Sequence, residues 1–255
     1  MARGYGYKPD GAACGLPAAR KLFGASPIAI PVAHSVPIHP EILDQGQSNS
    51  CVAHALCSAI RDRLLNLGVK SARLASRLWV YYHARLAEEN GAELEDGGAY
   101  VSLAAKSLRE YGFPSEAVWQ FDPLGVYDPP PLLAVNRSHD QRGKLRVHRL
   151  SDGAERETEI RECLVRNIPL VIGTQVDAAF EEYAGGWWDF SGPSLGGHAI
   201  ECVGFDQHGV ECRNSWSKDF GDHGYIRLGW RSVRDPQVVS DAFAIDFAPN
   251  FSEAA

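Results

Sequence analysis

The spacing of apolar residues predicts that the first half of the chain is mainly helical. One apolar stripe repeats every four residues and predicts a helix over residues 51–66. Its members are Val52, Leu56, Ile60 and Leu64. The helical spacing recurs in 76–91 and 98–112, and a glycine stands at the end of each of these segments. We therefore expect three helices before the middle of the chain.

The second half has the short alternating or continuous apolar runs that are typical of β-strands. The predicted strands are 144–150, 169–176, 224–230 and 241–247, and 198–216 is predicted to form a hairpin that turns at 207–209. A short helix is expected over 158–168. A helical first half followed by a mostly β second half predicts an α+β fold.

Two segments stand outside these patterns. Residues 121–131 are dense in proline, which indicates a boundary between two lobes. Residues 1–40 are rich in glycine, alanine and proline and have weak periodicity, so we expect an extended or irregular N-terminal extension.

Composition narrows the class of protein. The 255 residues are 45% hydrophobic and 22% charged, which suits one large soluble domain or two modest lobes. A net charge of -7 argues against nucleic acid as a partner, because phosphate binding needs a basic face. No apolar run is long enough to predict a membrane partner, and the first eleven residues lack the apolar region of a signal peptide. We expect a cytoplasmic monomer, although a protein exported without such a signal would look the same.

The cysteines are spaced like free thiols. The six positions are 14, 51, 57, 163, 202 and 212. They form no CxxC pair and no Cys/His ligand cluster, so we expect no metal site and no cofactor. In a chain of this length without a signal peptide, thiols are favoured over disulfides.

Cys51 is a candidate nucleophile because of where the first helix begins. Ser50 is a candidate N-cap, which places the Cys51 thiol at the positive end of the helix dipole, where thiolate is favoured. The competing interpretation is a small buried hydrophobic residue, and for an arbitrary cysteine that interpretation is favoured. His54 lies one turn further on the same face, and we expect a packing or hydrogen-bonding role for it.

A nucleophilic cysteine needs a base and a group that orients the base. His198 opens the predicted hairpin, and Asn214 lies sixteen residues later, where the hairpin returns. Asn214 could accept a ring N–H of His198, and Trp216 could shield that bond from water. The alternative is an ordinary hairpin with an incidental asparagine and a core tryptophan.

Three segments resemble, in order, the signature blocks of papain-like cysteine peptidases. They are "DQGQSNSCVAHAL", "GGHAIECVGFD" and "RNSWSKDFGDHGYIRL". The separation between Cys51 and His198 fits the roughly 130–150 residues of that family. "LEDGGAY" and "SLREYGFPSEAVWQFD" resemble further family segments. The resemblance covers about residues 41–247 and is greatest to bacterial and phage members that lack the family's disulfides.

The resemblance implies a two-lobed fold with the active-site cleft between the lobes. Residues 41–255 would form the catalytic domain, with a mainly helical L-lobe over 41–130 and a β-barrel-like R-lobe over 131–255. Residues 1–40 would precede it as an N-terminal extension that could cover the cleft. Within them, "LFGASPIAIPVAHSVP" could lie over the cleft, or it could pack on the back of the R-lobe as an edge strand, and we favour the edge strand.

The resemblance also implies catalytic roles. Cys51 would be the nucleophile, paired with His198 as thiolate and imidazolium, and its pKa should be strongly depressed. Asn214 would orient His198. The Gln45 side chain and the backbone N–H of Cys51 would bind the oxyanion.

Further residues would bind substrate. Gly97 and Gly98 would pair with the substrate backbone as an added strand. Asn49 would lie beside the pocket for the side chain at the scissile bond, and Trp216 would wall the leaving-group side. Gly197 is a further candidate for substrate binding.

Asp241 would form the floor of the pocket for the second substrate side chain. A carboxylate there would favour Arg or Lys. The alternative is that Asp241 is solvated or caps its strand.

The implied activity is that of a cysteine endopeptidase, whose partner is a peptide or protein substrate and whose intermediate is a Cys51 thioester. Another amide chemistry on the same scaffold is one alternative: a deamidase, a transglutaminase or a peptidoglycan amidase. A peptide-binding homologue without activity is the other.

Overall fold

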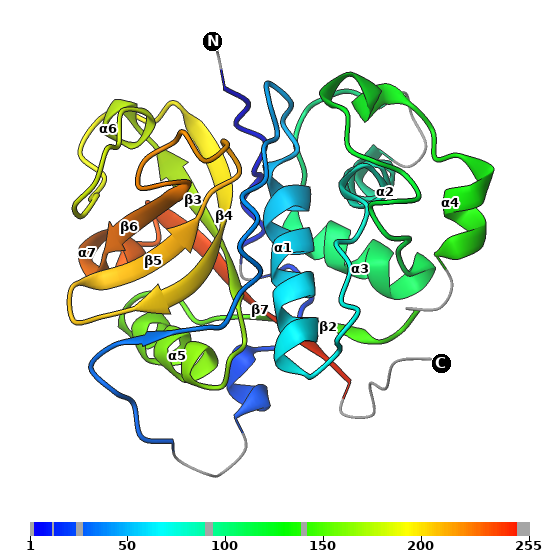
Figure 1. Ribbon diagram of the computed structural model, residues 1–255. Helices are drawn as coiled ribbons and strands as arrows, with labels where there is room; N and C mark the ends of the chain where they lie inside the picture. Colours follow the sequence, from blue (N-terminus) through cyan, green and yellow to red (C-terminus); the bar gives the residue numbers. More distant parts are fainter. Residues whose placement is uncertain (1–2, 12, 24–27, 90–93, 139–141, 249–255) are drawn as a thin grey trace.

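The computed structural model describes residues 3–11, 13–23, 28–89, 94–138 and 142–248 (Figure 1). The helices are η1 (Ala19–Leu22), α1 (Cys51–Asn66), α2 (Arg77–Glu89), α3 (Val101–Tyr111), η2 (Pro123–Tyr127), α4 (Leu132–Arg137), α5 (Ala154–Val165), α6 (Ala178–Glu181) and α7 (Trp230–Arg234). The strands are β1 (His34–Ser35), β2 (Leu145–Arg149), β3 (Leu170–Val176), β4 (Gly196–Phe205), β5 (Gly209–Arg213), β6 (Tyr225–Gly229) and β7 (Val239–Phe247).

The three long helices of the first half are confirmed. α1 begins and ends where the apolar stripe predicts, and all four stripe residues are buried. Burial extends well beyond the stripe, because α1 lies between the helical half and the sheet (Figure 1). The predicted stop at Gly91 lies outside the described residues. None of the described helices has both the length and the apolar character needed to cross a membrane.

The predicted strands and hairpin are confirmed as parts of one antiparallel sheet. The strand order is β2-β7-β3-β4-β5-β6, and β1 pairs with β4 away from this path. The α+β fold class is confirmed, and over the described residues the sheet of the barrel-like lobe is open and does not form a closed barrel. The reason lies in β2, where Leu145 and Val147 pack into the core of the helical half. The β2 edge therefore turns toward the helices and does not close on β6.

The predicted short helix of the β half begins and ends earlier than its apolar residues suggest. α5 starts at Ala154, directly after Gly153, and has two glutamates in its first turn, which favour a helix N-terminus. The helices α4, α6 and α7 were not predicted, because four to six residues are too short to show a helical period.

Two apolar cores lie on either side of the cleft. One is built from α1, α2 and α3, and the other lies between the sheet, α5 and the aromatic residues near α6. The helical core continues beyond residue 131, because Ala134 of α4 belongs to it. The division of the lobes is therefore less sharp than the proline-dense segment suggests.

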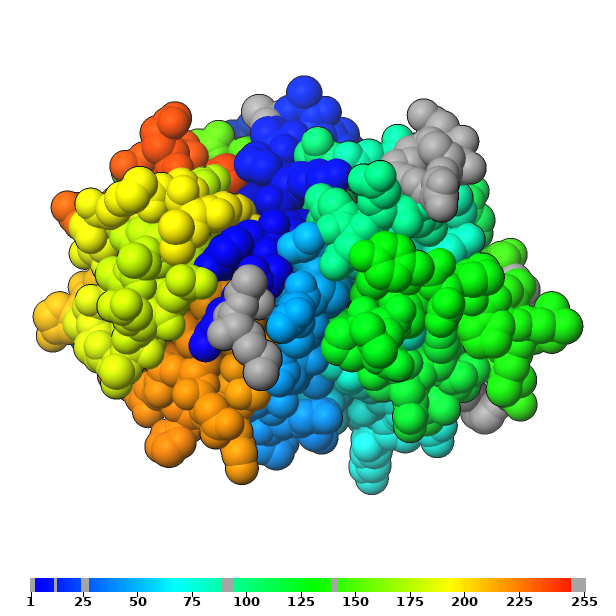
Figure 2. All heavy atoms as spheres, turned by 90° about the horizontal axis from the view of Figure 1, so that it is seen from above, coloured from blue at the N-terminus to red at the C-terminus, as the bar shows by residue number. Residues whose placement is uncertain are grey.

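The N-terminal extension contributes to both halves. His34 and Ser35 pair with Phe205 and Gly204 at the edge of the sheet. Residues 24–27 of the stretch "LFGASPIAIPVAHSVP" lie outside the described residues. Residues 3–11, which we call the N-terminal segment, run between the two lobes (Figure 1). In the view from above, the dark-blue N-terminal residues lie between the yellow β half and the light-blue and green helical half (Figure 2).

Candidate active site

Cys51 is the first residue of α1 and is completely buried. Its sulfur is hydrogen-bonded by the backbone of Ala199, which places it beside the strand that carries His198. Ser50 occupies the N-cap position, but its side chain does not cap the helix. Its hydroxyl lies 2.6 Å from the Ser48 hydroxyl and 3.2 Å from Nδ1 of His54. The Ser50 hydroxyl therefore contacts these two polar side chains and does not make the predicted capping hydrogen bond.

Gln45 is fixed in the turn that leads to Cys51. Its Oε1 accepts a hydrogen bond of 2.7 Å from the Ser215 hydroxyl, so its Nε2 is left to donate. Nε2 donates to the carbonyl of Ser48 at 2.8 Å and to that of Gly4 at 3.2 Å. Gly4 belongs to the N-terminal segment. The predicted oxyanion donor thus already holds a peptide carbonyl.

His198 and Asn214 are brought together by the β4–β5 hairpin, as the sequence predicts. Nε2 of His198 donates to Oδ1 of Asn214 at 2.8 Å. Oδ1 also accepts from the backbone N–H of Ser215 at 2.8 Å, which fixes the amide. The indole of Trp216 stacks on the imidazole with ring centroids 4.5 Å apart, so it shields this hydrogen bond.

The protonation state of His198 follows from this arrangement. With its proton on Nε2, the neutral ring has a lone pair on Nδ1, and Nδ1 is buried and has no hydrogen-bond partner in the part of the chain that the structure describes. Burial lowers the pKa of His198 from 6.5 to about 4, the Asn214 hydrogen bond opposes this, and the nearby Arg3 lowers it further. The imidazole is therefore neutral near pH 7 in this conformation.

The thiol of Cys51 is also neutral here. Burial raises its pKa from 9.0 to about 11, and backbone hydrogen bonds from Ala199, Gly6, Val52 and Cys51 itself only partly offset that effect. The expected strong depression of this pKa is absent from the conformation described. The physical reason is the N-terminal segment, which excludes water from the helix N-terminus, so desolvation outweighs the dipole.

Two glycines let the N-terminal segment lie directly on the turn before α1. A Cβ atom on Gly4 would lie 2.1 Å from the carbonyl oxygen of Ser48. A Cβ atom on Gly6 would lie 1.7 Å from the carbonyl oxygen of Asn49. Both contacts are with backbone atoms, which cannot move aside as a flexible side chain could. Only glycine fits at either position.

The N-terminal segment is hydrogen-bonded to both walls of the cleft. Tyr7 N–H donates to the carbonyl of Gly197 at 3.0 Å. On the helical side, Ala99 N–H donates to the carbonyl of Gly6 at 2.7 Å, and Lys8 N–H donates to the carbonyl of Ala99 at 3.1 Å. Gly197 thus contacts the backbone of the N-terminal segment.

The predicted glycine pair, Gly97 and Gly98, lies next to the backbone hydrogen bonds between the N-terminal segment and the helical side of the cleft, but does not make them. Gly98 has a φ of +86°, and a Cβ there would lie 2.2 Å from the carbonyl oxygen of Gly6. At Gly97 a Cβ would meet only the end of the Lys8 side chain, at 3.8 Å. The backbone bonds are made by Ala99, one residue further on.

Asn49 is held by the helical wall. Its backbone N–H donates to both carboxylate oxygens of Asp96, at 3.0 and 3.1 Å, and its side chain donates to the Asp96 carbonyl at 2.5 Å. Its own backbone faces Gly6.

Asp241 lies buried on β7, opposite Gly173 of β3. Oδ1 accepts from Nε of Arg149 at 2.8 Å, so the carboxylate is neither solvated nor a strand cap. Oδ2 accepts from the Tyr7 hydroxyl and from the backbone N–H of Asp10 at 2.9 Å.

Several residues of this site were not predicted. Ser215 orients Gln45, and Arg149 pairs with Asp241. A cover over the cleft was considered for the N-terminal extension through its stretch 22–37, whereas residues 3–11 occupy the cleft. Their place in the cleft had a signal in "GYGYK", residues 4–8, where glycine and tyrosine alternate. Alternation places both glycines on one face of an extended chain and both tyrosines on the other.

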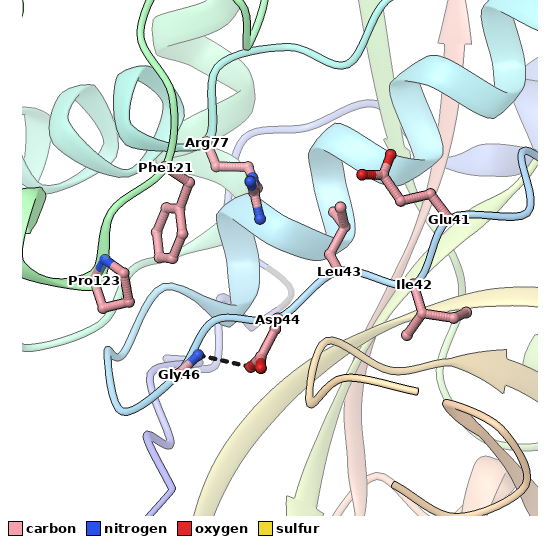
Figure 3. A pocket seen from close by; sticks show the side chains of 8 residues that line it. All are labelled: Glu41, Ile42, Leu43, Asp44, Gly46, Arg77, Phe121 and Pro123. Atoms are coloured by element: carbon pink, nitrogen blue, oxygen red, sulfur yellow. Dashed lines mark hydrogen bonds between the residues drawn. The ribbon is translucent and has the colours of Figure 1, made fainter. Parts of the chain in front are cut away.

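His54 has the packing role that the sequence suggests. Its Nδ1 lies 3.0 Å from the Ser50 carbonyl and its Nε2 lies 3.0 Å from a guanidinium nitrogen of Arg77. The ring meets Phe121 edge-on. Arg77 and Phe121 also line an open pocket outside the Gln45 turn, where Asp44 Oδ1 accepts from Gly46 N–H at 2.9 Å (Figure 3).

Solved structures of cysteine proteases resemble this fold over nearly the whole chain. Xylellain, a cysteine protease from Xylella fastidiosa, has a TM-score of 0.79 at 24% identity, covering 97% of each chain. Procathepsin B S9 from Trypanosoma congolense has a TM-score of 0.72 at 20% identity, covering 96% of this chain and 87% of the other.

Sequence comparison leads to the same group. The peptidase C1-like protein L477 of Acanthamoeba polyphaga mimivirus is 28% identical over 218 residues, which are 80% of this chain and 68% of that protein. Cathepsin B-like CP2 of Giardia intestinalis is 23% identical over 216 residues, 80% of this chain and 69% of that protein. The model of the papain family cysteine proteases matches residues 35–244. The chain therefore belongs to the papain family and is a cysteine peptidase.

Proposed function

We propose that the chain is an endopeptidase that cleaves through a Cys51 thioester and that its N-terminal segment keeps it latent. The observation that carries the proposal is the hydrogen bond between His198 and Asn214. It leaves Nδ1 of His198 without a hydrogen-bond partner among the described residues. The next residue on the same strand, Ala199, contacts the Cys51 sulfur through its backbone. Family membership makes the chain a cysteine peptidase. No observation on the site favours the alternative amide chemistries.

In the first half of the reaction, Nδ1 of His198 takes the proton of the Cys51 thiol. The thiolate attacks the peptide carbonyl carbon, and the carbonyl oxygen becomes an oxyanion. Nδ1–H then protonates the leaving amine as the C–N bond breaks, which leaves a thioester on Cys51. In the second half, Nδ1 takes a proton from water, the hydroxide attacks the thioester, and the acid leaves as Cys51 regains its proton.

Gln45 and the backbone N–H of Cys51 stabilise the oxyanion. Ser215 holds the Gln45 amide so that Nε2 points into the cleft, where it donates to a carbonyl of the N-terminal segment. Donors that are fixed before the reaction need no reorganisation when the oxyanion forms, so they lower the barrier effectively.

The N-terminal segment supports latency because it blocks the site without offering a bond to cleave. The backbone of Gly6 hydrogen-bonds to the Cys51 sulfur, and its carbonyl is directed to Ala99 on the helical wall. A donor, and not a carbonyl carbon, therefore faces the thiol. Water is excluded, and both catalytic groups stay neutral.

The test compares the full-length chain with a chain that lacks residues 1–11. We expect the shortened chain to react with a peptidyl epoxide at Cys51 at least about tenfold faster than the full-length chain. It should hydrolyse a small peptide substrate faster by a similar factor. The reason is that in the full-length chain only the fraction of molecules whose N-terminal segment has left the cleft can react. Peptide mapping identifies the labelled residue. A shortened chain that folds but neither reacts at Cys51 nor cleaves peptides would refute the proposal.

A further inference from the structure

The side chain of Tyr7 fills a pocket in the β half of the cleft. The pocket lies where β3 and β7 pair, with Gly173 opposite Asp241. A Cβ atom on Gly173 would lie 2.0 Å from Cζ of the Tyr7 ring, so the space exists because Gly173 has no side chain. Tyr7 is only 4% exposed. The pocket therefore accommodates a complete aromatic side chain next to Gly6, which contacts the Cys51 sulfur.

The floor of this pocket recognises a hydroxyl group. The Tyr7 hydroxyl donates to Oδ2 of Asp241 and lies 3.2 Å from the hydroxyl of Ser240. Burial and the neighbouring Asp241 carboxylate raise the pKa of Tyr7 well above its usual range, so the phenol stays protonated and can donate. A phenylalanine in this position would leave Oδ2 of Asp241 without that donor.

The charge of Asp241 is already balanced within the protein. Arg149 donates to its Oδ1, and Arg149 and Arg156 both contact Asp152, at 2.9 and 2.6 Å. Two guanidinium groups and two carboxylates therefore form one network. A lysine or arginine of a substrate would meet a paired carboxylate next to a fixed guanidinium, so it would gain little attraction and would be repelled by Arg149.

We propose that this pocket selects a tyrosine side chain of peptide substrates, with Asp241 accepting the phenol hydroxyl and Arg149 excluding cations. The inference rests on the proposed function and adds the substrate class to it. It replaces the expectation of a preference for Arg or Lys, which considered Asp241 without its partner. Arg149 lies on β2, and only the pairing of β2 with β7 brings it to Asp241.

One experiment uses the N-terminal segment of the full-length chain as the occupant of the pocket. The rate at which iodoacetamide modifies Cys51 reports how often the segment leaves. We expect Tyr7→Phe to be modified several-fold faster than wild type and Tyr7→Arg at least about tenfold faster. Adding Arg149→Gln to Tyr7→Arg should slow modification again, because the freed Asp241 can then pair with the new arginine.

Two further variants guard against an unfolded protein. Arg146→Gln on the exposed side of β2 is the matched control for Arg149→Gln and should change nothing. Gly173→Ala fills the pocket and should release the segment even if Arg149→Gln fails to fold. Equal rates for wild type and Tyr7→Phe, or slower modification of Tyr7→Arg, would overturn the inference.

The second experiment measures peptides that differ only in the residue that enters the pocket: Tyr, Phe or Arg. Ratios of kcat/KM between peptides do not depend on the fraction of open enzyme, so the full-length chain serves. We expect tyrosine to exceed phenylalanine by about tenfold and arginine by more. Cleavage without a preference for tyrosine overturns this inference and leaves the proposed function intact. If neither the full-length chain nor the chain that lacks residues 1–11 cleaves any peptide, the proposed function fails, and the labelling experiment still decides what the pocket binds.

Discussion

Different forces hold the two parts of the site. The first part, which we call the wall, comprises α1 and the sheet, which carry the candidate catalytic residues. The second part, which we call the cover, is the N-terminal segment, residues 3–11. Cys51 begins a helix whose buried apolar side chains belong to the helical core, and His198 lies in the interior of the sheet. The N-terminal segment has no core of its own. Two glycines, backbone hydrogen bonds and the buried side chain of Tyr7 hold it in the cleft, together with surface contacts of four further side chains: Arg3, Tyr5, Lys8 and Asp10.

This difference means that the cover can leave without disturbing the wall. Residues that pack through long helices and central strands open only with the whole fold, whereas a short segment fixed by a few polar contacts opens locally at a much smaller cost. Substitutions in the wall should therefore change chemistry or stability, and substitutions in the segment should change access.

The largest effect is expected from Cys51→Ala. Without the sulfur no thioester can form, so peptide hydrolysis should fall by about 10⁴-fold or more. The fold should persist, because alanine is small and favours helix at this position. Turnover by the shortened chain with and without the substitution measures the loss, and thermal unfolding verifies the fold. Appreciable turnover by a folded Cys51→Ala protein would mean that the reaction uses another group.

Asn214→Ala should have a smaller effect. The substitution removes the acceptor for Nε2–H of His198 and so frees the ring to rotate and to change tautomer, while nucleophile and base remain. We expect kcat to fall by about 100-fold with little change in KM, because orientation is lost and binding is not. Steady-state kinetics at several pH values give this split. A change confined to KM would contradict the orienting role of Asn214.

Gly6→Ala tests the cover alone. The new Cβ would meet the Asn49 carbonyl oxygen at 1.7 Å, so the segment must shift away from Cys51. We expect alkylation of Cys51 to become about tenfold faster and the stability of the fold to be unchanged. Gly97→Ala is the matched control, because its Cβ would make only an ordinary 3.8 Å contact. Equal alkylation rates for these two variants would show that the fit of Gly6 does not hold the segment.

Most of the fold could be predicted because its elements have strong local patterns. The stripe of α1 fixes both the bounds of the helix and its buried face, and the β4–β5 hairpin brings Asn214 to His198 over only sixteen residues. The open sheet could not be predicted. It depends on β2 packing against the helical core, which is a contact between distant parts of the chain.

The candidate site, like the fold, could be predicted only where its residues stand in local motifs. Gln45, Cys51, His198 and Asn214 stand in recognisable local motifs, and the structure brings them to one cleft. The charge state of the site was missed, because it depends on nine residues at the start of the chain that exclude water from Cys51. The ion pair of Asp241 was missed because its partner Arg149 is 92 positions away in sequence. Local patterns place side chains on elements, but electrostatics depends on what the fold places around them.

The last effect concerns stability and not activity, and it involves His54, which belongs to the wall and does not touch the cover. Burial, together with the Arg77 guanidinium, lowers its pKa from 6.5 to about 3. A proton on Nε2 would face that guanidinium at 3.0 Å, which explains why the folded protein resists protonation of this ring. The unfolded chain takes up the proton near pH 6.5. The stability contributed by neutral His54 is therefore complete above that pH and is lost progressively as the pH falls toward 3.

At pH 5 this linkage corresponds to about 2 kcal/mol. His54→Gln should reduce the difference in unfolding free energy between pH 7.5 and pH 5 by roughly that amount, whatever it does to stability at pH 7.5. Denaturant titrations at the two pH values measure it. The reduction should be the same in the Gly6→Ala background, because His54 belongs to the wall and the wall stays folded when the cover leaves. A His54→Gln effect that depends on Gly6 would show that the wall and the cover are coupled and not independent.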